Sequence, residues 1–254
     1  MRGTQSDGYF TSAFVLLVLG ALWFGACSGS SNSPNPGAVG GSGNNLGGLG
    51  GGAGYPPAST TSCTTDPLRT GITDQVNTDD YDCLILQLTQ KYAEPDAMIF
   101  KAIIYVESRF QYDAVACTNL PCGVPTGWTA AEAQCFGLMQ IVLACNPQTG
   151  DLGLDASGHP DLSRDFASSD WAGSIFNPAV NIERGIAGIA DNRRQEKTRF
   201  TGCTEEQYTL MAIGDYNSYG STQSCTTYNT SYDNLVLDRY RTYCTASGWS
   251  AHAY

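Results

Sequence analysis

A tract with few apolar side chains divides the chain into unequal parts. Residues 28–62 read SGSSNSPNPGAVGGSGNNLGGLGGGAGYPPASTTS, in which glycine, serine, asparagine and proline predominate. Such a segment buries too little apolar surface to offset the conformational entropy lost on ordering, so we expect a disordered tether over residues 27–62. The sequence therefore leaves residues 63–254 for a single folded domain.

A short apolar run precedes the tether. Residues 13–26, AFVLLVLGALWFGA, are too few to span a bilayer as a helix and suit the core of a secretory signal over residues 1–26. The small residues before Cys27 resemble a bacterial lipoprotein signal, in which the cysteine is lipidated and becomes the mature amino terminus; an ordinary secretory signal is the alternative. We expect an exported protein, either held by Cys27 at the periplasmic face of the outer membrane or secreted.

Cysteine usage agrees with export. Nine cysteines follow Cys27, and they are spread through the folded part instead of being grouped in metal-binding spacings. This distribution predicts disulfide bonds and no metal site, and the odd number leaves one thiol unpaired. Cys117 and Cys122 flank Pro121 and suggest a bond that closes a small loop.

Charge and histidine content narrow the possible chemistry. The formal net charge is −11 and the basic residues form no stripe, which argues against nucleic acid as a partner. The two histidines, His159 and His252, lie in a loop-like segment and at the carboxyl end. Chemistry that depends on histidine is therefore poorly supported.

Helical periodicity dominates from residue 79 onward, and strand-like alternation is scarce. Helices are expected over about 79–92, from Pro95 through Val106, from Asn177 as a cap and Pro178 through Ile189, over 205–216 and over 232–244. Two long irregular stretches, 117–135 and 146–176, separate the second helix from the third. Loops of this length usually carry function or need covalent support. The sequence thus predicts a mainly α domain with long, disulfide-bordered loops.

One carboxylate ends the second predicted helix. Helical spacing places Glu107 on the same face as Ile103 and Ile104. Burial raises the pKa of a carboxyl group, and a glutamic acid that stays protonated near neutral pH can act as a general acid. The alternative is an exposed glutamate in the last turn that pairs with Arg109 or Lys101.

Three motifs follow Glu107-Ser108 in order: FGLMQI at 136–141, NIERG at 181–185 and MAIGDYNSYG at 211–220. Together they resemble the lytic transglycosylase domain of the lysozyme-like superfamily. In that family a helix ending in Glu-Ser is followed by Gly-Leu-Met-Gln, Asn-Ile-x-x-Gly and Ala-x-x-Tyr-Asn. The resemblance covers about residues 95–220 and implies a lysozyme-like catalytic domain.

The resemblance implies a role for each matched residue. Glu107 would be the catalytic acid and base, and the substrate contacts would be Ser108, Gly137, Leu138, Met139, Gln140, Asn181, Tyr216 and Asn217. The residues alone leave structural alternatives: a helix-end cap for Ser108, core positions for Leu138 and Met139, helix packing for Asn181 with Gly185, and a packed tyrosine with a satisfied hydroxyl for Tyr216.

A single carboxylate suffices for the implied reaction, since Asp113 and Asp215 are not compelling partners. Asp215 and Tyr219 also depart from the family pattern, which has alanine and glycine there. The family cleaves peptidoglycan between N-acetylmuramic acid and N-acetylglucosamine. One carboxylate is enough there, because the acetamido group of the sugar takes the part of a second carboxylate and its 6-hydroxyl takes the part of water. This needs no metal or cofactor and leaves 1,6-anhydro ends.

Two other functions remain open. A hydrolytic lysozyme, of muramidase or chitinase-like activity, would use the same fold and the same acid. A non-catalytic lipoprotein that binds the cell wall would keep the fold without turnover. In every case the expected partner is a glycan strand of the wall, and the membrane is contacted only through Cys27.

Overall fold

The computed structural model describes residues 63–72, 78–117, 122–145, 151–217, 224–227, 230–250, 252 and 254. All of them belong to one unit of the chain, Gly52–Tyr254, and none to the other, Met1–Gly51. The expected signal segment, Cys27 and the expected tether therefore lie outside the described residues.

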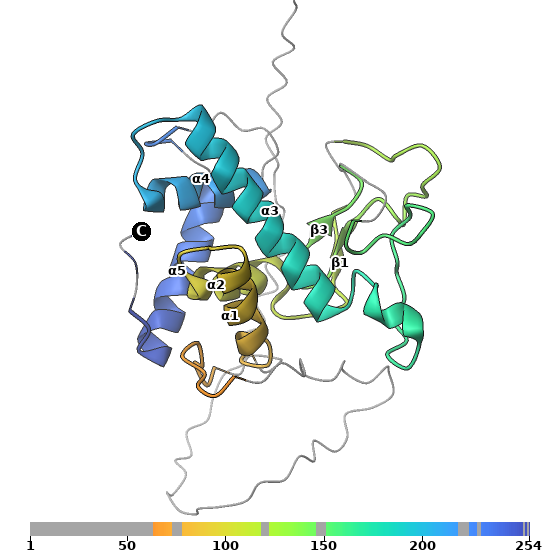
Figure 1. Ribbon diagram of the computed structural model, residues 1–254, viewed down its shortest axis with the longest axis horizontal. Helices are drawn as coiled ribbons and strands as arrows, with labels where there is room; N and C mark the ends of the chain where they lie inside the picture. The colour runs from red at the N-terminus through yellow and green to blue at the C-terminus, as the bar shows by residue number, and fades with distance from the viewer. Residues whose placement is uncertain are drawn as a thin grey trace, which may run out of the picture. The chain divides into compact units, whose positions relative to one another are not determined.

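Five α-helices lie in the described part of the chain (Figure 1): α1 Asp82–Lys91, α2 Ala97–Ser108, α3 Pro178–Arg199, α4 Glu205–Asn217 and α5 Thr230–Ser247. They occupy the predicted segments, with α3 and α5 longer at their carboxyl ends than periodicity indicated. Asn177 caps α3 by accepting a hydrogen bond from the Ala179 amide at 3.0 Å, and Pro178 fills the first turn, as expected. The prediction of a mainly α domain is confirmed.

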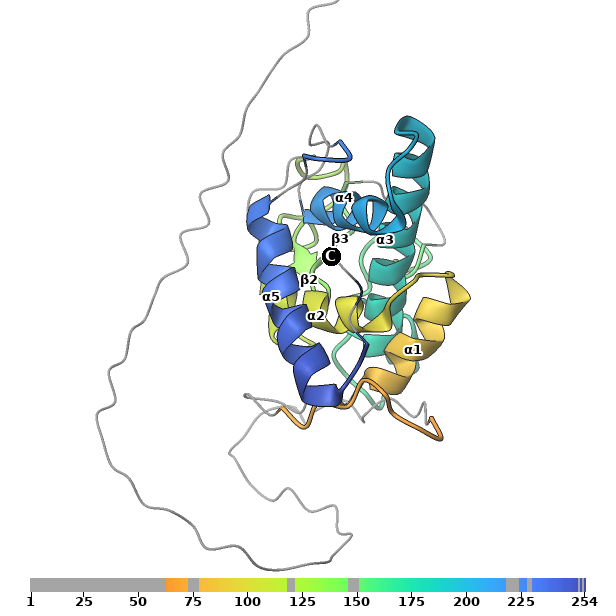
Figure 2. The same ribbon diagram turned by 90° about the vertical axis from the view of Figure 1, so that its left-hand side faces the viewer.

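Helices α2 and α5 pack against each other and cross in the view of Figure 2. At one end, Tyr232 of α5 contacts Glu107 of α2. At the other, Asp96 caps α2 and accepts hydrogen bonds from Tyr240 at 2.5 Å and from Trp249 at 3.1 Å. Both ends of the candidate catalytic helix are therefore tied to the last helix.

A small antiparallel sheet lies between α2 and α3 in the sequence. Its strands are β1 Val115–Ala116, β2 Cys135–Phe136 and β3 Ile141–Val142, in the order β1-β2-β3. Residues 137–140 form the tight connection from β2 to β3. A short 3₁₀ helix, Ser169–Ala172, lies in the longer stretch between β3 and α3. The sheet thus presents the Gly-Leu-Met-Gln motif on a hairpin turn.

Four disulfide bonds form in the described residues: Cys63–Cys83, Cys117–Cys135, Cys122–Cys145 and Cys203–Cys225. The predicted disulfides are confirmed, and Cys244, which is buried, is the free cysteine of the described residues. The suggested bond between Cys117 and Cys122 is wrong. Pairing of Ala116 with Cys135 brings Cys117 beside Cys135, so the register of the hairpin decides the partner.

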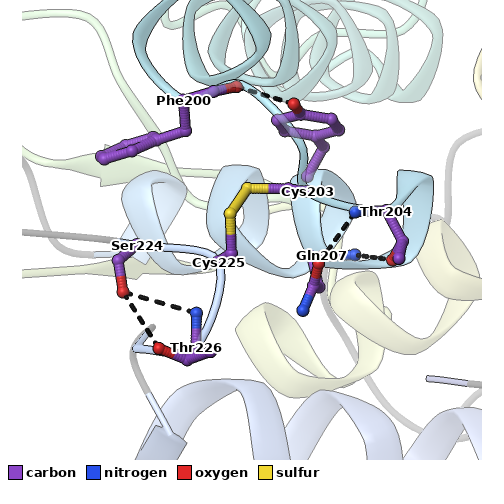
Figure 3. The surroundings of a disulfide bond; sticks show 8 residues. Phe200, Cys203, Thr204, Gln207, Ser224, Cys225 and Thr226 are labelled. Carbon is purple, nitrogen blue, oxygen red and sulfur yellow. Dashed lines mark hydrogen bonds between the residues drawn. A yellow bond between two sulfur atoms is a disulfide. The ribbon is translucent and has the colours of Figure 1, made fainter.

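One disulfide braces the end of the domain that carries α4 and the start of α5 (Figure 3). Cys203 precedes α4, and Cys225 lies in the segment 224–227 that precedes α5. Beside it the Thr204 amide donates to Gln207 Oε1 at 2.8 Å, and the Gln207 amide donates to Thr204 Oγ1 at 3.2 Å. This reciprocal cap satisfies amides that the first turn of a helix leaves without partners.

The disulfide pattern predicts the outcome of a thiol titration. Nine cysteines follow Cys27 and eight of them are bonded, so nine minus eight leaves one thiol. A Cys27→Ser variant, denatured without reductant, should react with about one equivalent of a thiol reagent and with nine after reduction. Reduction should also lower stability, since each closed loop restricts the unfolded chain. Nine reactive thiols before reduction would contradict the pairing.

Candidate active site

Glu107 is the penultimate residue of α2 and is half-buried. Burial raises the pKa of its carboxyl to about 7, and a hydrogen bond donated by the Tyr232 hydroxyl opposes that rise only in part. The alternative ion pairs are not formed: Glu107 pairs with no cation of the described residues. Lys101 is enclosed elsewhere, 2.6 Å from Asp79 Oδ1 and 2.8 Å from Asp82 Oδ2. Glu107 is thus a carboxyl group whose pKa lies near neutral pH.

Tyr232 is the site residue that sequence reasoning missed. Its buried hydroxyl donates to Glu107 Oε1 across 125 positions of the chain. Burial and the nearby charge of Glu107 raise its pKa well above the usual range, so it remains a donor. Periodicity placed Tyr232 at the start of the last predicted helix, but no motif marked it as functional. The packing of α5 against α2 brings it to Glu107.

Tyr216 lies near the same carboxyl at the end of α4. Burial and the charge of Glu107 raise the pKa of Tyr216 well above its usual range. Its hydroxyl donates to the backbone carbonyl of Met139 at 2.5 Å, a contact between the third and the first of the motifs that follow Glu107. The structure therefore gathers Glu107, Tyr232, Tyr216 and the hairpin turn at one place.

The turn after β2 depends on Gly137. This residue has φ +72°, and its amide donates to the Ala114 carbonyl at 2.8 Å. A Cβ atom at this position would lie 2.3 Å from Asn181 Nδ2 and 2.8 Å from Asn181 Cγ. Glycine is thus needed both for the backbone conformation and for the close approach of α3.

Asn181 fixes this turn by hydrogen bonds to its backbone. It is fully buried, and its Nδ2 donates to the carbonyls of Phe136 at 2.8 Å and Ile175 at 2.9 Å. Its Oδ1 accepts from the Met139 amide at 2.7 Å. One turn further along α3, a Cβ on Gly185 would lie 2.3 Å from Met139 Sδ. The four-residue spacing of Asn181 and Gly185 thus fits α3 against the turn. This is the structural role that the sequence alone left open for these two residues.

The side chains of the turn are largely enclosed. Leu138 and Met139 are fully buried, which places them in the core. Gln140 has φ +49° and donates through Nε2 to the Gly137 carbonyl at 2.8 Å and the Ala114 carbonyl at 3.3 Å. Within the described residues its Oε1 has no hydrogen-bond partner. Gln140 therefore retains acceptor capacity that the turn itself does not use.

The other predicted contact residues lie at helix ends. Ser108 is buried, and its hydroxyl donates to the Ile104 carbonyl at 3.1 Å, one turn back in α2. Asn217 is exposed and ends α4. The structure thus places Ser108 inside its helix and Asn217 at the surface beside Tyr216.

Neither candidate second carboxylate is a cause of the raised pKa of Glu107. Asp113 is exposed, whereas Asp215 adds to the effect of burial in raising the pKa values of Glu196 and Asp233. Burial and Tyr232 account for the pKa of Glu107 within the described structure. The arrangement offers one acid that can give and take a proton, flanked by two tyrosines.

No protein-family model matches the chain, and no curated protein matches it. None of the helices in the described residues is long and apolar enough to cross a membrane. The same residues contain no group of three or more His, Cys, Asp or Glu side chains arranged to hold a metal ion.

Proposed function

We propose that the protein cleaves the β-1,4 bond between N-acetylmuramic acid and N-acetylglucosamine in peptidoglycan and leaves 1,6-anhydromuramic ends. The observation that carries this proposal is the pKa of Glu107, about 7, in contact with Tyr232. A carboxyl group with such a pKa is suited both to donate and to accept a proton at neutral pH. The ordered motifs around Glu107 support the choice of substrate.

The proposed reaction has two steps. In the first, the Glu107 proton passes to the bridging oxygen, the C1–O bond breaks, and the acetamido oxygen of the muramic residue bonds to C1. In the second, the 6-hydroxyl oxygen of that residue attacks C1, the bond to the acetamido oxygen breaks, and Glu107 takes the hydroxyl proton. Between the two steps Glu107 is ionised, and Tyr232 stabilises this state because its donated hydrogen bond favours the carboxylate.

Tyr216 supports the geometry of the site. Its bond to the Met139 carbonyl links α4 to the hairpin turn and leaves that carbonyl fixed near Glu107. General acid catalysis depends on such placement, since a proton is transferred only over a hydrogen-bond distance.

Clearing of a suspension of purified cell walls tests the proposal. Addition of the folded, oxidised protein should lower the turbidity continuously, because each cleavage shortens a glycan strand. Sedimentation of the protein with the walls, without clearing, would support a wall-binding lipoprotein instead.

The four disulfides indicate an oxidising environment outside the cytoplasm. We further propose attachment to the outer membrane by lipid on Cys27, supported by the apolar run and the small residues before it. Cys27→Ala should move the protein from the membrane fraction to the soluble periplasmic fraction, because the apolar run is too short to span a bilayer. Equal membrane retention of variant and parent would contradict the anchor.

A further inference from the structure

Two acidic residues adjoin the two tyrosines of the site in sequence. Asp215 directly precedes Tyr216 in α4, and Asp233 directly follows Tyr232 in the first turn of α5. Each of the helices that bring a tyrosine to Glu107 therefore carries a carboxyl group at the neighbouring position. Helices α4 and α5 pack against each other.

Asp233 is an unusual buried group. Its exposed fraction is 1 %, and within the described part of the chain neither of its carboxyl oxygens has a hydrogen-bond partner. A charged carboxylate in such surroundings is costly, and a neutral carboxyl group is much less so. Burial, with the negative charge of Asp215, raises the pKa of Asp233 to about 7. Asp233 is therefore predominantly neutral below pH 7.

The charged and titratable groups around Asp233 are mostly acidic. The charge of Asp215 on α4 acts on Asp233, and the charge of Asp233 acts on Tyr232 of the same helix. Asp215 in turn interacts with Glu196 on α3. No cation of the described residues donates a hydrogen bond to either carboxyl oxygen of Asp233, and Arg199 lies 2.6 Å from Glu196. Ionisation of Asp233 would therefore add a negative charge beside Asp215 without an opposing cation at contact distance.

We propose that Asp233 is a positioning residue for Glu107: its neutral carboxyl lets the first turn of α5 pack against α4 and keeps Tyr232 on Glu107, and its ionisation loosens that contact. This inference rests on the proposed catalytic role of Glu107. It deepens that role, because the active form of the site then needs two protons, one on Glu107 and one on Asp233.

The pH dependence of wall cleavage distinguishes one required proton from two. Well above the pKa values, a rate that needs two protonated groups falls about 100-fold per pH unit, and a rate that needs one falls about tenfold. We expect the parent to approach the steeper limit between pH 8 and 9 at low wall concentration. Asp233→Asn, in which residue 233 stays neutral, should approach the shallower limit of about tenfold per pH unit. A merely structural role would scale the rate at every pH and leave the slope unchanged.

Two further variants sharpen this experiment. Asp238→Asn changes an exposed acid on the same helix, paired with Arg241, and should leave the profile as it is in the parent. Asp215→Asn should shift the alkaline limb to lower pH, because removing its charge lowers the pKa of Asp233. Asp233→Asn should thus make the alkaline limb shallower, whereas Asp215→Asn should move it to lower pH.

A second measurement does not depend on activity. The folded-state pKa of Asp233, about 7, lies above its ordinary value of 3.8, so its contribution to stability falls as the pH rises through that interval. Thermal unfolding of Glu107→Gln should show this fall between pH 4 and 7, and Glu107→Gln/Asp233→Asn should show a smaller one. If Asp233→Asn does not fold, Asp233→Ala serves in both measurements.

The outcomes separate the two proposals. Failure to cleave walls at any pH would overturn the proposed function, while the unfolding series still reports on Asp233. Equal unfolding series would show that Asp233 does not titrate and would overturn the inference. An alkaline limb equally steep in the parent and in Asp233→Asn would overturn the positioning role.

Discussion

Glu107→Gln should reduce the rate of wall cleavage by about 10⁴-fold or more, because general acid catalysis alone is typically worth about 10²- to 10⁴-fold and this residue is also the proposed base. The amide keeps the shape of the side chain and can accept the Tyr232 hydrogen bond, but it has no acidic proton to give. The initial rate of turbidity loss, measured against the parent at pH 6, is the readout.

The same variant should remain folded. Burial makes the ionised form of the Glu107 carboxyl costly, and a neutral amide removes that cost. The stability of the variant above pH 7 should therefore equal or exceed that of the parent. Asp113→Asn is the matched control, since Asp113 is exposed and is not a cause of the raised pKa of Glu107. Retention of more than about a tenth of the parental rate by Glu107→Gln would show that this residue is not the general acid.

Gly137→Ala should lower the free energy of unfolding by about 3 kcal/mol, the sum of a left-handed backbone that alanine disfavours and an overlap in a packed interior. The added Cβ would lie 2.3 Å from Asn181 Nδ2, whose amide group makes three hydrogen bonds to the backbone. Either the turn or α3 must shift, which would also displace the Met139 carbonyl from Tyr216. Denaturant unfolding of the oxidised protein measures the loss.

Gly123 provides a control for the backbone contribution. It has φ +70°, close to that of Gly137, but a Cβ there would meet nothing within 4 Å. Gly123→Ala should therefore cost only about 1 kcal/mol, from conformation alone. Equal losses for the two variants would mean that the approach of Asn181 to the turn contributes nothing to stability.

Local patterns predicted the helices well. Helical period placed all five helices of the described residues, and Asn177 caps α3 as predicted. The expected place of Pro95 in the first turn of α2 is wrong, because Asp96 caps that helix and Pro95 precedes the cap. The apolar spacing before Glu107 correctly indicated a raised pKa. These features depend on residues a few positions apart, where side-chain spacing and backbone geometry are directly related.

Contacts between segments that are distant in the sequence could not be predicted from such local patterns. Tyr232 meets Glu107 only because the start of α5 packs against the end of α2, and nothing near Tyr232 in the sequence encodes that contact. Cys117 pairs with Cys135 because of a strand register, which the spacing of cysteines does not contain. The motif residues Asn181 and Gly185 were found, but only the structure shows that they fit α3 to the hairpin turn.

The masses of the glycan fragments released from purified peptidoglycan test the central proposal most directly. If Glu107 delivers its proton and the muramic 6-hydroxyl closes on C1, the fragments should end in 1,6-anhydromuramic acid and be one water molecule lighter than the corresponding hydrolysis products. These fragments should be absent from digests with Glu107→Gln. Fragments that contain the added water, with free reducing ends, would contradict the proposed reaction and identify a hydrolytic lysozyme.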